Sequence, residues 1–197
     1  MDALIGVLAL QGAFAAHEQS LANCGVLTRQ VRVAEDLFGL DGLVIPGGES
    51  TTMSNLLLRT AMFDALRDAI QNGLPVFGTC AGMIMLSREV IDGRSDQVSF
   101  AAMDIAVRRN AYGRQVDSFE TDIAVQGLVE PFHAVFIRAP KVEAVGGGVD
   151  VLAELDGVPV LVREGNRMAA SFHPELSPDS SVHMLFVEQI VASKSKV

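Results

Sequence analysis

The chain has 197 residues, enough to bury a hydrophobic core without disulfide or metal staples, so a single domain over residues 1–197 is expected. Hydrophobic residues make up 49% of the chain and charged residues 20%, which is typical of globular proteins and excludes a disordered chain. The formal net charge of −9 argues against a nucleic-acid or anionic-membrane surface, because such surfaces need clustered lysine and arginine. A small anionic substrate, held by one or two arginines, remains compatible with this charge.

Cysteine usage and the N-terminal sequence predict a cytoplasmic protein. Cys24 and Cys80 form neither a CxxC pair nor a metal-ligand pattern with the four histidines. Two cysteines exclude a disulfide scaffold and fit a reducing compartment. Met1 and Asp2 lack the basic flank of a signal peptide, and the apolar run over residues 3–10 is far shorter than the roughly 20 residues that cross a bilayer.

Short apolar runs alternate with helical patterns over the first half of the chain. Strands are predicted at residues 4–10, 26–33, 43–45 and 74–79. Helices are predicted at residues 13–23, 61–70 and 83–86, with a further helix N-capped by Ser50, Thr51 or Thr52. This βαβα alternation predicts an α/β fold of the flavodoxin-like, three-layer kind, with a mostly parallel central sheet flanked by helices.

The second half of the chain follows a different pattern. Residues 101–162 show alternating strands and turn glycines with little helical periodicity, which predicts an antiparallel extension on the same core. A strand at 168–172 and a helix over about 179–192 follow, before a polar tail at 193–197.

The sharpest local signal is Gly78-Thr79-Cys80-Ala81-Gly82, between a predicted strand and a predicted helix. It has the form of a nucleophile elbow with cysteine in place of serine. The helix N-terminus would lower a thiol pKa and stabilise an oxyanion. A buried structural cysteine is the alternative, but the flanking glycines favour a nucleophile. Cys24 has no such context and is interpreted as structural.

A general base and its orienting carboxylate are available in His173-Pro174-Glu175, directly after another predicted strand. Proline favours an extended conformation at His173, so that His173 and Glu175 can project to the same side. An exposed polar turn is the alternative. His17, His133 and His183 have no comparable partner in the sequence and are expected on the solvated surface.

A third segment, Pro46-Gly47-Gly48-Glu49-Ser50, also follows a predicted strand. Its glycines would let backbone N–H groups point at a ligand oxygen, although an ordinary glycine turn is the simpler explanation of this segment alone. Carboxyl ends of parallel strands line the ligand crevice of open α/β sheets, so the three segments should meet. Together they predict acyl transfer through a cysteine triad.

The chain resembles the class I (triad) glutamine amidotransferases and, among them, the glutaminase subunits of pyridoxal 5′-phosphate synthase. GTCAG and HPE mark the wider class, whereas PGGESTTM at 46–53, GRQVDSFE at 113–120 and FIRAP at 136–140 are narrower. Residues 6–12, 77–84, 108–120 and 171–176 also match. Ala111-Tyr112 stands where Ser-Phe is expected, a departure that affects no proposed catalytic role.

The resemblance implies hydrolysis of L-glutamine to glutamate and ammonia by Cys80, His173 and Glu175 through a γ-glutamyl thioester. It implies an oxyanion hole at Gly48 and Ala81. The glutamine contacts that it implies are Gly48, Glu49, Ser50, Arg109, Ile137 and Arg138. Arg109 or Arg138 could instead pair only with surface acids.

The resemblance also implies a (β/α)₈-barrel synthase partner that receives the ammonia, in a hetero-oligomer commonly of twelve copies of each subunit. Pyridoxal 5′-phosphate would be the partner's product and not a cofactor of this chain. Because 197 residues match a glutaminase domain alone, the acceptor is expected on a separate chain. Two alternatives stay open: another cysteine hydrolase acting on a γ-glutamyl or amide substrate, and a non-catalytic subunit.

Overall fold

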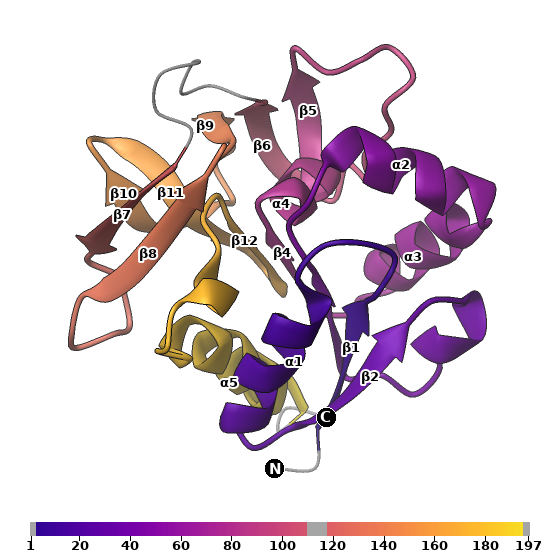
Figure 1. Cartoon of the computed structure of the whole chain (residues 1–197), viewed down its shortest axis with the longest axis horizontal. Helices are drawn as coiled ribbons and strands as arrows, with labels where there is room; N and C mark the ends of the chain where they lie inside the picture. Colours follow the sequence, from indigo (N-terminus) through magenta and orange to yellow (C-terminus); the bar gives the residue numbers. More distant parts are fainter. Residues whose placement is uncertain (1–2, 110–117, 195–197) are drawn as a thin grey trace.

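Seven strands form the central sheet of the computed structural model, which describes residues 3–109 and 118–194 (Figure 1). The spatial order is β10-β11-β12-β4-β3-β1-β2. The parallel strands are β1 (Leu4–Leu8), β2 (Leu27–Val31), β3 (Gly42–Ile45), β4 (Val76–Thr79) and β12 (Arg167–Ala170). The antiparallel strands β10 (Asp150–Leu155) and β11 (Val158–Glu164) extend one edge, which confirms the predicted fold class.

Helices cover both faces of this sheet. One face carries α1 (Phe14–Asn23) and α5 (Ser181–Lys194), which lie together in Figure 1. The other carries α2 (Ser50–Arg59), α3 (Met62–Gln71) and α4 (Ala81–Leu86). Two short 3₁₀ helices, η1 (Ala34–Leu37) and η2 (Pro174–Leu176), complete the described helical elements.

The inner strands β1, β3 and β4 are almost wholly buried and largely apolar, because helices cover both faces of the sheet there. Successive side chains point to opposite faces of a strand. Val44 accordingly packs with the α1/α5 cluster, whereas its neighbours Leu43 and Ile45 pack with α2, α3 and α4. Phe77 and Val76 divide between the two clusters in the same way.

The region predicted as one antiparallel extension is divided among three sheets. Besides β10 and β11, a three-stranded sheet contains β5 (Ser87–Ile91), β6 (Met103–Arg108) and β9 (Lys141–Val145). The pairs formed within residues 101–162 are antiparallel, as predicted, whereas β6 also pairs in parallel with β5, which lies outside that region. β7 (Ser118–Ile123) and β8 (Phe132–Ile137) form a hairpin whose Phe132 and Phe136 join the α1/α5 cluster.

Local signals also differ from prediction at the start of α2. Glu49, and not Ser50, Thr51 or Thr52, is the N-cap residue: its carboxylate accepts hydrogen bonds from Thr51 N at 3.0 Å and Thr52 N at 2.6 Å. A carboxylate at this position satisfies N–H groups that lack an intrahelical acceptor. Within the described residues, no helix is both long enough and apolar enough to span a membrane.

Candidate active site

Cys80 occupies the tight turn between β4 and α4, with φ 51° and ψ −103°. Positive φ is rare for a residue with a side chain and recurs at functional sites. Glycine is required on both sides of this turn. A Cβ on Gly78 would lie 2.6 Å from the backbone of Gly82, and a Cβ on Gly82 would lie 2.1 Å from the carbonyl oxygen of Ile45. The turn therefore depends on the small residues of the Gly78–Gly82 motif.

His173 and Glu175 come together beside this turn, where the chain leaves β12. The His173 N–H donates to Val135 O of β8 at 2.8 Å, which fixes the segment against the hairpin. The ring Nδ1 lies 2.8 Å from Glu175 Oε1, and Cys80, whose Sγ lies 4.0 Å from Ile137 O, contributes to raising the pKa of the ring. Glu175 is 6% exposed and belongs to η2, which begins at Pro174. The predicted proximity of His173 and Glu175 is therefore present in the structure.

The electrostatics of this pair favour a charged ring and a charged carboxylate. Burial opposes the charged imidazole, but hydrogen bonds to Cys80 and Glu175 outweigh it and raise the pKa of His173 above its usual 6.5. Burial likewise opposes ionisation of Glu175, but the hydrogen bond from His173 and the nearby His17 and His173 rings hold the pKa of this carboxyl below 4.5. Glu175 can thus orient the ring and stabilise its cationic form.

The Gly47–Gly48 turn at the end of β3 closes against the same residues. A Cβ on Gly47 would lie 2.5 Å from His173 Cε1 and 3.3 Å from Cys80 Cβ. Gly48 has φ +144°, and a Cβ there would come within 3.2 Å of the Gln11 side chain. Only glycine lets this backbone approach the cysteine and histidine so closely.

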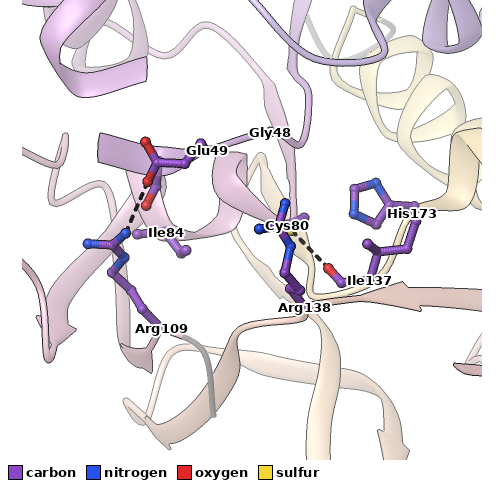
Figure 2. Close-up of a pocket in the computed structure, with 9 residues that line it drawn as sticks. Gly48, Glu49, Cys80, Ile84, Arg109, Ile137, Arg138 and His173 are labelled. Atoms are coloured by element: carbon purple, nitrogen blue, oxygen red, sulfur yellow. Dashed lines mark hydrogen bonds and ion pairs between the residues drawn. The ribbon is translucent and has the colours of Figure 1, made fainter. Parts of the chain in front are cut away.

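A small pocket of about 130 Å³ opens over Cys80. It is lined by Gly48, Glu49, Ser50, Cys80, Ile84, Arg109, Ile137, Arg138 and His173. Figure 2 shows His173 on one side of Cys80 and the Arg109–Glu49 pair on the other. Of the predicted site residues, Ala81 and Glu175 do not line the pocket. Ala81 begins α4 next to Cys80, and Glu175 lies behind His173.

The two pocket arginines differ in their partners. Arg109 donates to Gln97 Oε1 at 2.8 Å and to Glu49 Oε1 at 3.1 Å. Arg138, at φ 43°, forms no ion pair with any residue in the described ranges. Its guanidinium is therefore available to an anionic ligand, whereas that of Arg109 is already held.

Sequence reasoning missed two residues of this pocket region. Ile84 lies one helical turn after Cys80, and its N–H donates to Cys80 O at 3.3 Å, so the spacing of four could have indicated it. Gln97 holds Arg109 and donates to Ser50 Oγ at 3.2 Å, but no sequence signal marks it. Ala111 and Tyr112 lie outside the described residues.

The expectation for two histidines was wrong. His17 and His183 are both fully buried, with His17 Nδ1 2.9 Å from His183 Nε2. They come from α1 and α5, which pack together on one face of the sheet, so that each ring finds its partner far away in the sequence. His133 is exposed, as expected, and its ring nitrogens lie near Asp122 and Glu120.

The described part of the chain contains no cluster of candidate metal ligands, and its second cysteine, Cys24, is buried. No group of three or more histidine, cysteine, aspartate or glutamate side chains there could hold a metal ion. Cys24 is buried, and burial together with Asp179 raises the pKa of its thiol to about 11. A thiol with so high a pKa is almost wholly protonated at neutral pH and is a poor nucleophile.

A cysteine on a strand–helix elbow, a histidine–glutamate pair and a glycine turn form the arrangement that is typical of cysteine-dependent acyl-transfer enzymes. The chain belongs to the SNO glutamine amidotransferase family, whose model matches residues 7–192.

Known proteins similar to this chain cover nearly all of it. The pyridoxal 5′-phosphate synthase subunit PdxT of Corynebacterium jeikeium is 57% identical, over 95% of this chain and 96% of the relative. The protein of the same name from Mycobacteroides abscessus is 53% identical, over 98% of this chain and 100% of the relative. A crystal structure of a glutamine amidotransferase superimposes with a TM-score of 0.89 at 46% identity, covering 94% of this chain and 98% of that one.

Proposed function

We propose that this chain is the glutaminase of a pyridoxal 5′-phosphate synthase and hydrolyses L-glutamine to L-glutamate and ammonia through a Cys80-His173-Glu175 triad. The observation that carries the proposal is the Cys80 elbow beside a histidine held by a buried carboxylate, in a chain of the glutamine amidotransferase family. Its relatives named as synthase subunits connect the released ammonia to a synthase partner.

In the acylation step, the Cys80 thiolate attacks the side-chain carboxamide carbon of glutamine. A C–S bond forms, the C–N bond breaks, and the His173 imidazolium gives its proton to the leaving nitrogen, which departs as ammonia. In deacylation, the neutral ring takes a proton from water, the hydroxide attacks the γ-glutamyl thioester, and glutamate and the Cys80 thiolate are released. The raised pKa of His173 supplies the protonated ring that the first step needs.

Charge on the substrate oxygen would be stabilised by the backbone N–H groups of Gly48 and Ala81. Ala81 is the first residue of α4, so its N–H has no acceptor within the helix. Gly47 and Gly48 bring the end of β3 against Cys80 and His173. Loss of one such donor typically costs about 3–4 kcal/mol of transition-state stabilisation.

The remaining pocket residues would hold the amino-acid end of glutamine. Arg138 suits the α-carboxylate, because a guanidinium can bind both carboxylate oxygens and this one has no ion-pair partner among the described residues. Arg109, Glu49, Ser50 and Ile137 would complete the contacts, with Arg109 fixed by Glu49 and Gln97.

The proposal extends to the assembly. Free ammonia is protonated in water and lost as a nucleophile, so delivery to a docked partner is required. We propose that this partner is a (β/α)₈-barrel synthase, that twelve copies of each subunit associate in the cytoplasm, and that residues 1–197 act as one glutaminase domain. Pyridoxal 5′-phosphate would be made by the partner and not bound here as a cofactor.

The test is glutamate release from glutamine labelled with ¹⁵N in its amide, by the purified chain with and without a barrel-type synthase subunit. We expect stoichiometric glutamate release and transfer of ¹⁵N into pyridoxal 5′-phosphate when both subunits are present. No glutamate in either arm would overturn the glutaminase activity. Hydrolysis of γ-glutamyl peptides in preference to glutamine would point instead to another cysteine hydrolase.

A further inference from the structure

A row of buried polar side chains continues behind the catalytic pair into the core. His173 contacts Glu175 Oε1, and the other carboxylate oxygen, Oε2, lies 3.3 Å from His17 Nε2. His17 Nδ1 then lies 2.9 Å from His183 Nε2. The side chains of His17 and Glu175 are both fully shielded from solvent. The row therefore joins the pocket to the packing of α1 against α5.

Both inner rings are neutral at physiological pH. Burial lowers the pKa of His17 to about 4, outweighing the nearby Glu175 carboxylate, and His173 lowers it further. Burial, together with His17, lowers the pKa of His183 to about 3 despite Glu175. A neutral imidazole has one N–H and one acceptor nitrogen, so the position of each proton decides which contacts in the row are attractive.

One arrangement of protons suits the geometry. With its proton on Nε2, the His17 N–H can donate to Thr79 Oγ1 at 3.2 Å and faces Glu175 Oε2 at 3.3 Å, and its Nδ1 accepts from the His183 Nε2–H. The opposite tautomer would aim a lone pair at the carboxylate. It would also place the His183 proton on Nδ1, a buried atom with no hydrogen-bond partner in the described structure. A buried donor without an acceptor is strongly disfavoured.

The contact with His17 matters because Glu175 Oε2 is otherwise unsatisfied. This oxygen is buried and forms no hydrogen bond with the described residues, and the polar contact that the structure gives it is with His17 Nε2 at 3.3 Å. Buried carboxylate oxygens without a partner are rare in folded proteins. A carboxylate free to rotate would let the His173 ring turn away from Cys80.

We propose that His17 is a positioning residue for the catalytic pair: its Nε2–H holds Glu175 Oε2, and His183 fixes the tautomer that makes this possible. The inference rests on the proposed glutaminase function but concerns the orientation of His173, which can be measured without turnover. His17 acts through Glu175 and touches no substrate.

Variants that imitate one ring nitrogen at a time separate this role from simple packing. Glutamine places its amide N–H near the position of Nε2, and asparagine places its own near Nδ1. We expect His17→Gln to retain kcat within about threefold of wild type in the synthase complex. His17→Asn and His17→Leu should lose about ten- to hundredfold in kcat, as for a lost hydrogen bond to a charged group, with KM changed less than about twofold.

The readout that needs no turnover is the pH dependence of Cys80 alkylation by iodoacetamide, followed by mass spectrometry of the Cys80 peptide. If Glu175 is loosened, the His173 cation is less stabilised and the alkylation midpoint moves to higher pH. We expect this rise in His17→Leu and His17→Asn, a smaller rise in His183→Leu, and none in His17→Gln or in the exposed-histidine control His133→Leu.

Two results would overturn the proposal: a folded His17→Asn variant with wild-type kcat and midpoint, or His17→Gln as impaired as His17→Asn. If His17→Leu does not fold, the comparison of His17→Gln with His17→Asn still tests the proposal. Absence of turnover in every sample, wild type included, would count against the glutaminase function, whereas the alkylation midpoints would still test the role of His17.

Discussion

Cys80 and Arg138 share an uncommon backbone conformation, with φ at 51° and 43°, and both line the pocket. Left-handed backbone disfavours residues with a side chain and persists only where the surroundings enforce it. Around Cys80 the backbone is closely packed, since a Cβ on Gly78 or Gly82 would lie within 2.6 Å of backbone atoms. At both positions this backbone carries a side chain to which we assign a role in the pocket, as nucleophile for Cys80 and as substrate-binding cation for Arg138.

The ion-pairing difference between the arginines leads to a prediction. Arg138→Gln should raise KM for glutamine about ten- to hundredfold and change kcat less than about threefold, because it removes a ground-state contact with the α-carboxylate. Glutamine and arginine are equally disfavoured by the positive φ at position 138, so the substitution should not change backbone strain. Steady-state kinetics of the synthase complex measure the effect, with Arg67→Gln on the outer surface of α3 as control. A fall in kcat at unchanged KM would contradict this role.

At the scale of elements, the active site depends on how closely β4, α4 and β3 approach one another. The would-be Cβ of Gly82 lies 2.1 Å from Ile45 O, a backbone atom that cannot move aside without distorting β3. The position of Cys80 is therefore set by glycine-dependent contact between backbones, and not by its own side chain.

Gly82→Ala should consequently lower the free energy of unfolding by about 1–3 kcal/mol, as for overpacking of a core, and should reduce activity in parallel. Gly147→Ala is the matched control, since a Cβ there meets nothing within 4 Å. Urea unfolding measures both variants. Equal stability of the two would show that the elbow tolerates a side chain.

Sequence patterns were sufficient to predict the three strands whose ends carry the candidate site residues. Apolar runs over residues 43–45, 74–79 and 168–172 predicted three strands, and their order along the sheet brings Cys80, His173 and Gly48 together. What they could not supply was contact between distant segments. His17 and His183 are 166 residues apart, and Gln97 reaches Arg109 from a loop without any motif. The parallel β5–β6 pair was missed because no strand was predicted at residues 87–91, where Arg88 and Glu89 interrupt the apolar pattern.

At the scale of the whole molecule, the buried histidines make stability depend on pH. The folded-state pKa values of about 4 for His17 and about 3 for His183 lie below the ordinary 6.5, chiefly because of burial. Between about pH 4 and 6.5 the unfolded chain therefore binds more protons than the folded one. Stability falls as pH falls through this window, by about 1.4 kcal/mol per pH unit for each such group.

Removing one ring should make this dependence shallower. We expect the free energy of unfolding to change less steeply with pH between 4 and 6.5 in His183→Leu than in wild type, by about 1.4 kcal/mol per pH unit, because one proton fewer is taken up on unfolding. Urea unfolding at a series of pH values measures this slope. His133→Leu should not reduce the slope in this way, because its ring is exposed and neighbouring Asp122 and Glu120 raise its pKa instead. Parallel slopes for wild type and His183→Leu would show that His183 is protonated in the folded state.

The fold shows where positive charges lie in the pocket of an acidic chain and how its two cysteines differ. The negative charge coexists with a pocket in which Arg109 and Arg138 supply the positive groups. The cysteines divide into Cys80, at the elbow beside His173, and Cys24, buried near Ser180 with a raised pKa. This contrast allows the mechanism to be tested with two substitutions of the same kind.

Glutamate release from glutamine by the complete synthase complex, compared between Cys80→Ala and Cys24→Ala, is the most direct test of the central claim. We predict that Cys80→Ala releases no glutamate above background while still assembling with the partner, and that Cys24→Ala stays within about threefold of wild type. Substantial glutamate release by Cys80→Ala would contradict the thioester mechanism and the role given to this cysteine.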